Sequence, residues 1–250
     1  MKINPTPPME LVPSVDHYSL SRLVRVDSSA VPGPPKGGPA NEEMRQRVYA
    51  VRSDRERLLE AMVRVSAERG YEATAVADVV ARADLEEGAF ERHFNDKEDC
   101  FLAAYQATSD VLVALTSTAF EGAGERTWAE RVAVALRAMV ELLAAESEVA
   151  RMAVVEVTAI PGDARVRSRE LLDRFIPFLE QGREVSEQGA ELPAETARFA
   201  IGGASSLIFD ELRAGRGPEL EAILPDLVFA VTMPYLGVAA AEAEMRKISI

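Results

Sequence analysis

Apolar side chains recur at the three- and four-residue spacing of an α-helix along most of this chain, and this periodicity constrains the fold more than any other feature. Leu58, Met62 and Val65 begin the pattern, and Gly70 follows them as a typical C-terminal helix stop. From Asp54 onward, no stretch alternates between apolar and polar residues for long enough to predict a strand. The sequence therefore predicts an all-α fold.

The same spacing predicts further helices. Two short ones follow the first, at Val76–Ala83 and around Phe90 and Phe94, and a long one contains Phe101 and Leu115. Pro177 is expected to kink a later helix. The remaining apolar runs that predict helices are Val132–Leu143, Leu171–Leu179, Ala197–Leu212 and Leu220–Val231.

The first part of the chain differs from the rest. Residues 1 to about 41 hold eight of the 14 prolines. The run VPGPPKGGPAN cannot be helical, because proline lacks the backbone N–H donor and restricts the residue before it. We expect residues 1–52 to form an extended, partly disordered arm, and its basic residues give it either a DNA contact or the role of a solvated tether.

Charge and composition exclude several classes of protein. The chain has 28 basic and 41 acidic residues, a net charge of −13, so it cannot hold nucleic acid by its overall charge, and any DNA contact must come from a local patch. The single cysteine, Cys100, excludes an intrachain disulfide or a multi-cysteine metal site. The two histidines, His17 and His93, are too few for a histidine-rich metal cluster, so we expect no metal and no cofactor.

Membrane and export signals are not evident in the sequence. The start, MKINPTPPMELVP, lacks the apolar core of a signal peptide. The longest apolar stretch, Leu227–Ala241, is shorter than the ~20 residues that span a bilayer and contains Pro234 and Gly237. We expect a cytoplasmic protein without a membrane partner.

The sequence also shows no pattern typical of an enzyme. Phosphate-binding GxxxxGK[ST] and nucleophilic GxSxG motifs are absent from it. The GxG at Gly215–Gly217 is followed by a proline, and no predicted strand precedes it, so we interpret it as a loop between helices. Cys100 follows Glu98 and Asp99, whose negative charges raise the pKa of a thiol and make it a poor nucleophile. We therefore expect no catalytic activity.

Residues 54–105 carry the most informative motif. A helix that ends at glycine, two short helices around a tight turn at Ala83-Asp84-Leu85, and a long helix have the size and spacing of a helix-turn-helix unit. The stretch HFNDKEDCFLAAY is its most specific part. Through these features the chain resembles the TetR/AcrR family of bacterial transcriptional regulators. The residues that carry the resemblance are Gly70, Tyr71, Thr74, Val76, Val79, Ala83, Leu85, Gly88, Phe90, His93, Phe94, Lys97 and Glu98.

The resemblance implies three parts: the arm of residues 1–52, a DNA-binding headpiece of residues 53–105 with the helix-turn-helix at about 75–94, and a ligand-binding and dimerisation body of residues 106–250. It implies a ligand-responsive repressor that binds a palindromic operator. It also implies a homodimer formed through residues 194–241, approximately, and an unidentified small-molecule ligand. Small residues at 200–206 would let two helices approach closely at such an interface.

The headpiece is acidic for a DNA-binding unit, with seven basic and thirteen acidic residues over 54–105. Asp84 stands where the family usually has glycine, and Glu91 where it usually has tyrosine. Asp84 and Glu87 also have the spacing of a capping box, and Asp84 tolerates a left-handed turn. The alternative to the DNA-binding regulator is therefore a sensor or interaction protein on the same scaffold, whose headpiece does not bind DNA by itself.

Two sets of site residues follow from the resemblance. Glu86 or Glu87 could accept a hydrogen bond from a cytosine amino group, and Thr74 and Lys97 are the expected phosphate contacts. The predicted DNA-binding residues are Arg52, Thr74, Ala75, Glu86, Glu87, Gly88, Arg92, His93 and Lys97. The predicted ligand-binding residues are Trp128, Met139, Met152, Phe175 and Phe178, although aromatic and Met side chains at helical spacing more often belong to the plain core.

Overall fold

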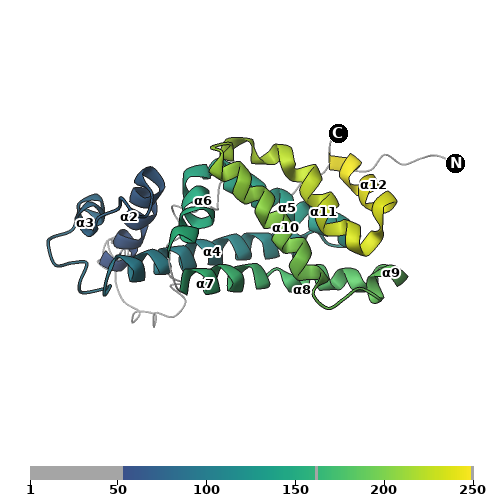
Figure 1. Cartoon of the computed structure of the whole chain (residues 1–250), viewed down its shortest axis with the longest axis horizontal. Helices are drawn as coiled ribbons and strands as arrows, with labels where there is room; N and C mark the ends of the chain where they lie inside the picture. The colour runs from purple at the N-terminus through teal and green to yellow at the C-terminus, as the bar shows by residue number, and fades with distance from the viewer. Residues whose placement is uncertain (1–52, 161–162, 249–250) are drawn as a thin grey trace, which may run out of the picture.

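The structure, a computed structural model, describes residues 53–160 and 163–248. Every regular element in these two ranges is helical, which confirms the all-α prediction. Two helices, α2 (Asp54–Arg69) and the shorter α3 (Val76–Ala83), lie at one end of an elongated molecule, and α4 (Lys97–Gly122) runs from them into the body (Figure 1). The predictions for the arm of residues 1–52 fall outside the described ranges.

Local sequence signals set the ends of the first helices. At the start of α2 the Ser53 hydroxyl accepts a hydrogen bond from the Glu56 N–H, and the Glu56 carboxylate accepts one from the Ser53 N–H. The helix ends at Gly70, whose φ of +82° lies in the region that favours glycine. α3 ends at Asp84 with φ +53°, so the turn keeps its left-handed residue without glycine, as expected.

The predicted third helix, around Phe90 and Phe94, is wrong. Residues 87–93 form turns, and Gly88 has φ +85°, which no regular right-handed helix permits. The Phe94 N–H still donates to the Phe90 carbonyl at 2.9 Å, so one helix-like turn remains. Both rings are buried, with centroids 5.6 Å apart. The four-residue spacing of Phe90 and Phe94 therefore arises because both rings are buried side by side. One helix-like turn is enough to place them in this way.

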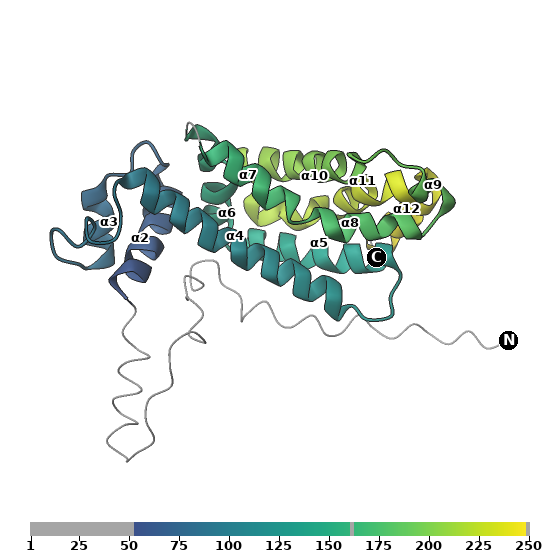
Figure 2. The ribbon, with the colours of Figure 1, turned by 90° about the horizontal axis from the view of Figure 1, so that it is seen from below.

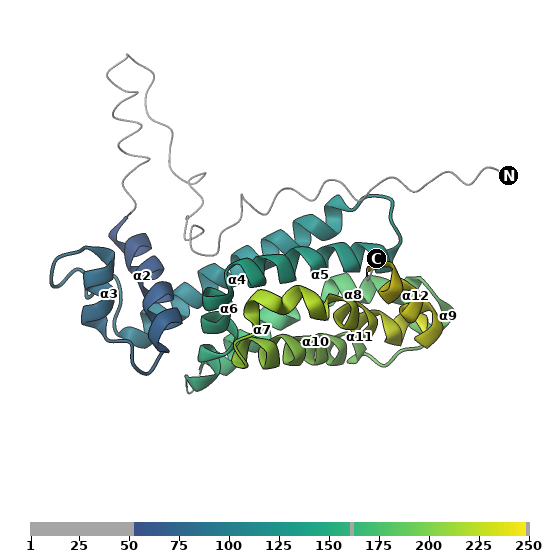
Figure 3. The same cartoon turned by 90° about the horizontal axis from the view of Figure 1, so that it is seen from above.

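The body consists of short and long helices in sequence. The predicted helix around Val132–Leu143 is confirmed by α5 (Trp128–Ala145), and Ala197–Leu212 by α10 (Thr196–Arg213). Figures 2 and 3 show α10 lying beside α11 in the body. The other elements are α6 (Ser147–Val154), η3 (Glu156–Ala159), α7 (Asp163–Asp173), α8 (Ile176–Glu180), η4 (Gln181–Glu184), α9 (Glu187–Ala190), η5 (Gly217–Ile223), α11 (Leu224–Leu236) and α12 (Val238–Ile248).

Proline divides two of the predicted body helices. Pro177 does not kink a continuous helix; it lies in the first turn of α8, after a break that follows Asp173. The run Leu220–Val231 likewise splits between η5 and α11, and Pro225 lies in the first turn of α11. Proline fits the first turn of a helix, where its missing N–H leaves no hydrogen bond unmade.

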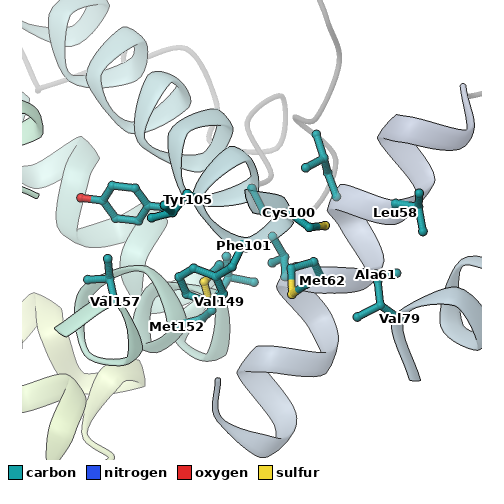
Figure 4. Close-up of a cluster of buried hydrophobic side chains, with 14 of the residues drawn as sticks. Leu58, Ala61, Met62, Val79, Cys100, Phe101, Tyr105, Val149, Met152 and Val157 are labelled. Atoms are coloured by element: carbon teal, nitrogen blue, oxygen red, sulfur yellow. The ribbon is translucent and has the colours of Figure 1, made fainter. Parts of the chain in front are cut away.

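Two clusters of buried apolar side chains hold the molecule together. The first joins α2, α3 and α4 to the body through Val149 and Met152 of α6, as Figure 4 shows around Phe101. The second fills the interior between α5, α10 and α11. Headpiece and body thus share one core at their junction. No helix within the described ranges combines the length and apolar character needed to cross a bilayer.

Candidate functional site

Carboxylates neutralise most of the arginines that the headpiece presents to solvent. Arg82 forms a two-pronged pair with Glu68 at 2.8 and 2.7 Å, and the Arg69 guanidinium lies 3.0 Å from Asp78. The hydrogen bond to Glu68 raises the pKa of Arg82. The further ion pairs are Arg57–Asp84 at 3.4 Å, Arg64–Glu60 at 3.7 Å, Arg92–Glu86 at 3.2 Å and Arg92–Asp54 at 3.7 Å.

The two remaining basic side chains of the described headpiece contact its scaffold. Arg55 lies over the Phe94 ring, 5.3 Å from its centroid. Lys97 Nζ donates to the Tyr71 and Glu72 carbonyls at 3.0 and 3.4 Å and lies 4.3 Å from the centroid of the Tyr71 ring. Lys97 therefore fastens the turn between α2 and α3 to the start of α4. To bind a phosphate, it would have to give up these bonds.

Thr74 is placed differently from its expected role as a phosphate contact. Its side chain is buried, and its Oγ1 donates to the Gly70 carbonyl at 2.8 Å and lies 3.4 Å from Ser66 Oγ. The hydroxyl thus closes the end of α2 inside the fold and does not reach solvent. Ala75, which follows it, is exposed and begins α3 without any side-chain hydrogen bond.

The predicted DNA-reading residues lie on the exposed turns after α3. Glu86, Glu87, Gly88, Arg92 and His93 are all exposed. The expected capping box between residues 84 and 87 does not form, because the N–H of residue 84 bonds back to α3 and no helix follows it. These residues are close together along the chain, and in the structure they lie on turns and not on one face of a helix. Arg52 falls outside the described residues.

A carboxylate of the body forms a hydrogen bond to the headpiece where the two parts meet. Glu156 Oε2 of η3 accepts a hydrogen bond from the Tyr71 N–H at 3.1 Å, and its Oε1 accepts one from Arg151 Nη2 of α6 at 2.9 Å. A Cβ on Gly70 would lie 3.1 Å from Glu156 Oε2, so the backbone at Gly70 lies close to this carboxylate. Sequence reasoning missed this contact, because nothing in the chain signals a pair 85 positions apart.

An apolar pocket lies within the body between α4, α5, α7, α8, α10 and α11. It encloses about 620 Å³ of empty space, counting the part that opens to solvent, and Met139, Phe175 and Phe178 are among its walls. Trp128 is outside the lining: its Nε1 donates to the Phe178 carbonyl at 2.9 Å and so supports one wall. Met152 is also outside, buried at the headpiece junction. We call this site the apolar pocket.

The exposed side of α10 carries two large apolar side chains. Phe199 is 80% exposed and Leu207 is 41% exposed, and Gly202 and Gly203 lie between them on the same side. Exposed apolar side chains that lie together on one face can mark an interaction surface. This face lies within the stretch expected to form a homodimer.

Two observations bear on reactive or metal-binding chemistry. Burial, together with the charge of Asp99, raises the pKa of the Cys100 thiol far above its usual range, which keeps the thiol protonated. The part of the chain that the structure describes contains no group of three His, Cys, Asp or Glu side chains placed to hold a metal ion.

Known proteins resemble this chain both in the sequence of the headpiece and in the fold. Residues 58–104 match the family described as bacterial regulatory proteins, tetR family. No curated protein matches the chain. Among solved structures, the fatty acid degradation regulator FadR from Bacillus halodurans superposes with a TM-score of 0.62 at 18% identity, covering 82% of this chain and 98% of its own.

Two further solved structures have the same fold. The transcriptional regulator FadR from Bacillus subtilis, in complex with stearoyl-CoA, gives a TM-score of 0.59 at 19% identity and covers 72% of this chain and 97% of its own. A tetR-family regulatory protein from Rhodococcus RHA1 gives 0.54 at 18% identity, covering 71% and 98%. At these identities the likeness concerns the fold.

Proposed function

From the premise that this chain carries the N-terminal domain of the tetR family of bacterial regulatory proteins, we propose that it is a ligand-responsive transcriptional regulator. In this proposal a homodimer binds a palindromic operator through its two headpieces and represses the adjacent promoter in the cytoplasm. A small molecule in the apolar pocket releases the DNA. The observation that carries the proposal is the apolar pocket against α4, the helix that continues into the headpiece.

The path from pocket to headpiece follows one helix. Thr116 and Phe120 of α4 line the apolar pocket, while Phe101 and Tyr105 of the same helix pack in the headpiece cluster. A ligand that tilts or shifts α4 at the first pair would also move the second pair. Ligand binding would favour the headpiece placement that follows from this movement, and this shifts the population between two arrangements.

The arginine–carboxylate pairs are compatible with DNA binding. Ion pairs at a protein surface contribute about 0–1 kcal/mol each, so a dense row of phosphates can displace the carboxylates. Arg92 lies in the exposed segment after α3, and Arg57 of α2 pairs with Asp84 at the start of that segment. We expect phosphates to displace the carboxylates of these two arginines first. The remaining acidic charge should make binding weak and sensitive to salt.

The apolar walls favour a ligand with a hydrocarbon chain. Leu136, Met139 and Val231 are typical of the walls, and no charged side chain lines the pocket. The fold neighbour from Bacillus subtilis was solved with stearoyl-CoA, a molecule that carries such a chain. We propose the same general class of ligand for this chain.

A titration of the purified full chain against the DNA upstream of its own gene tests the DNA-binding part. Fluorescence anisotropy at two ionic strengths should show binding that weakens as salt rises, because phosphate contacts release counterions. A scrambled duplex of equal length is the control. Equal affinity for both duplexes would count against a specific operator.

The second candidate function is a sensor or interaction protein without DNA binding. It is favoured by the irregular turns at residues 87–93 and by the pairing of the headpiece arginines with carboxylates. A folded protein that retains no DNA even at low salt would select this alternative.

A further inference from the structure

A second connection between the body and the headpiece runs beside α4, through α7 and η3. Two neighbouring leucines of α7 pack in different places. Leu172 lines the apolar pocket, whereas Leu171 packs against the buried cluster that joins the headpiece to the body. A displacement of α7 at the pocket therefore also displaces a side chain at the headpiece junction.

The short element η3 continues this connection. It contacts both α7 and α6. Val157 and Ile160 of η3 are each 2% exposed and belong to the same buried cluster as Phe101 of α4, as Figure 4 shows for Val157. Because protein interiors are close-packed, a shift of α7 is transmitted to η3 and is not absorbed by empty space.

Glu156, the first residue of η3, binds the headpiece through its carboxylate. Its Oε2 accepts a hydrogen bond from the Tyr71 N–H at 3.1 Å, and its Oε1 accepts one from Arg151 Nη2 at 2.9 Å. The Glu156 side chain is 14% exposed, so water competes weakly for these bonds. Arg151 fixes the carboxylate on the side of the body. The position of η3 therefore affects the position of the Tyr71 backbone.

Tyr71 is the residue at which the two connections meet. Lys97 Nζ of α4 donates to the Tyr71 carbonyl at 3.0 Å, and the Tyr71 ring lies edge-on to the Phe101 ring, with centroids 4.9 Å apart. Only residues 72–75 separate Tyr71 from the start of α3. A movement of Tyr71 is therefore transmitted to the first helix of the helix-turn-helix.

We propose that Glu156 is a positioning residue that couples occupancy of the apolar pocket to the placement of the helix-turn-helix. A ligand that displaces α7 at Leu172 shifts η3, and this shift withdraws the Glu156 carboxylate from the Tyr71 N–H. Tyr71 then follows the movement of α4. The inference rests on the proposed function and deepens it, since it adds a regulatory contact between the ligand pocket and the headpiece.

A matched pair of variants tests the coupling in the full chain without ligand or DNA. Leu172→Phe and Leu136→Phe each add a ring to the lining of the apolar pocket, the first on α7 and the second on α5. Hydrogen exchange followed by NMR gives the exchange rate of the Tyr71 amide. The Met62 amide, inside α2, reports opening of the whole headpiece. The quantity compared is the Tyr71 rate divided by the Met62 rate.

Leu172→Phe should raise this ratio by at least about fivefold, the lower end of typical coupling between two sites. Leu136→Phe should leave the ratio unchanged, because its added ring presses on α5 and not on α7. Glu156→Gln should raise the exchange rate of the Tyr71 amide by about tenfold, since it weakens a hydrogen bond to a charged acceptor. In a Glu156→Gln chain, Leu172→Phe should have no further effect on the ratio, a result that a merely structural role of Glu156 does not produce.

Three results would overturn the inference. They are an unchanged Tyr71 rate in Glu156→Gln, equal ratios in Leu172→Phe and Leu136→Phe, and an effect of Leu172→Phe that persists in the Glu156→Gln chain. If the larger ring prevents folding, Leu172→Ala and Leu136→Ala give the same comparison, and the ratio should again change only in the α7 variant. The DNA titration described above tests the proposed function separately.

Discussion

At the scale of single residues, Glu156 links the body to the headpiece through its carboxylate. Glu156→Gln replaces a charged acceptor by an amide, so the bonds from the Tyr71 N–H and Arg151 weaken. We expect the free energy of unfolding to fall by about 1–3 kcal/mol, as for a hydrogen bond to a charged group. Urea denaturation measures it. Glu148→Gln, at an exposed position of α6, should change stability little, and equal losses in both variants would refute the role of Glu156.

Cys100 gives a second prediction at this scale. Its thiol is buried and its raised pKa favours the neutral form, so almost no thiolate exists at pH 8 in the folded protein. A thiol reagent should therefore react only when the headpiece opens. Labelling followed by mass spectrometry should be slow in buffer and fast in urea. Fast labelling of the folded protein would contradict the burial of Cys100.

At the scale of elements, α3 lacks a capping side chain. Ala75 already has the extended φ of −102° and ψ of 149° of an N-cap residue, and Ala75→Ser would add an acceptor for the Asp78 N–H. We expect a gain of about 1 kcal/mol in the free energy of unfolding. Thermal unfolding checks it against Ala77→Ser, an exposed position inside α3 where serine adds no cap. A gain from Ala77→Ser of similar size would argue against capping.

The elements also show how far sequence reasoning extends. α2 and α3 were predictable, because caps and apolar spacing act locally on each helix. The turns around Gly88 were not, since Phe90 and Phe94 have helical spacing and only the tertiary setting fixes the φ of Gly88. At the apolar pocket, residue type alone could not distinguish Phe178, which lines the pocket, from Trp128, which donates a hydrogen bond to the Phe178 carbonyl from outside the lining.

At the scale of the whole molecule, the exposed apolar face of α10 predicts assembly. Phe199→Asp should convert a homodimer into monomers without unfolding them, because the ring is 80% exposed in the single chain. Sedimentation velocity measures the change in mass, and circular dichroism checks the fold. Val166→Asp, at a 56% exposed position on α7, is the control and should leave the mass unchanged. A Phe199→Asp protein of unchanged mass would place the interface elsewhere.

The uninterrupted course of α4 has a geometric consequence. With 26 residues at a rise of about 1.5 Å each, the helix acts as a lever of about 39 Å. A tilt of about 5° at its far end would swing its tip by about 3 Å. Two such levers in a dimer would change the gap between their tips by up to twice that amount. Successive major grooves repeat every ~34 Å along a duplex. A small tilt is therefore enough to prevent the two tips from entering successive grooves at the same time.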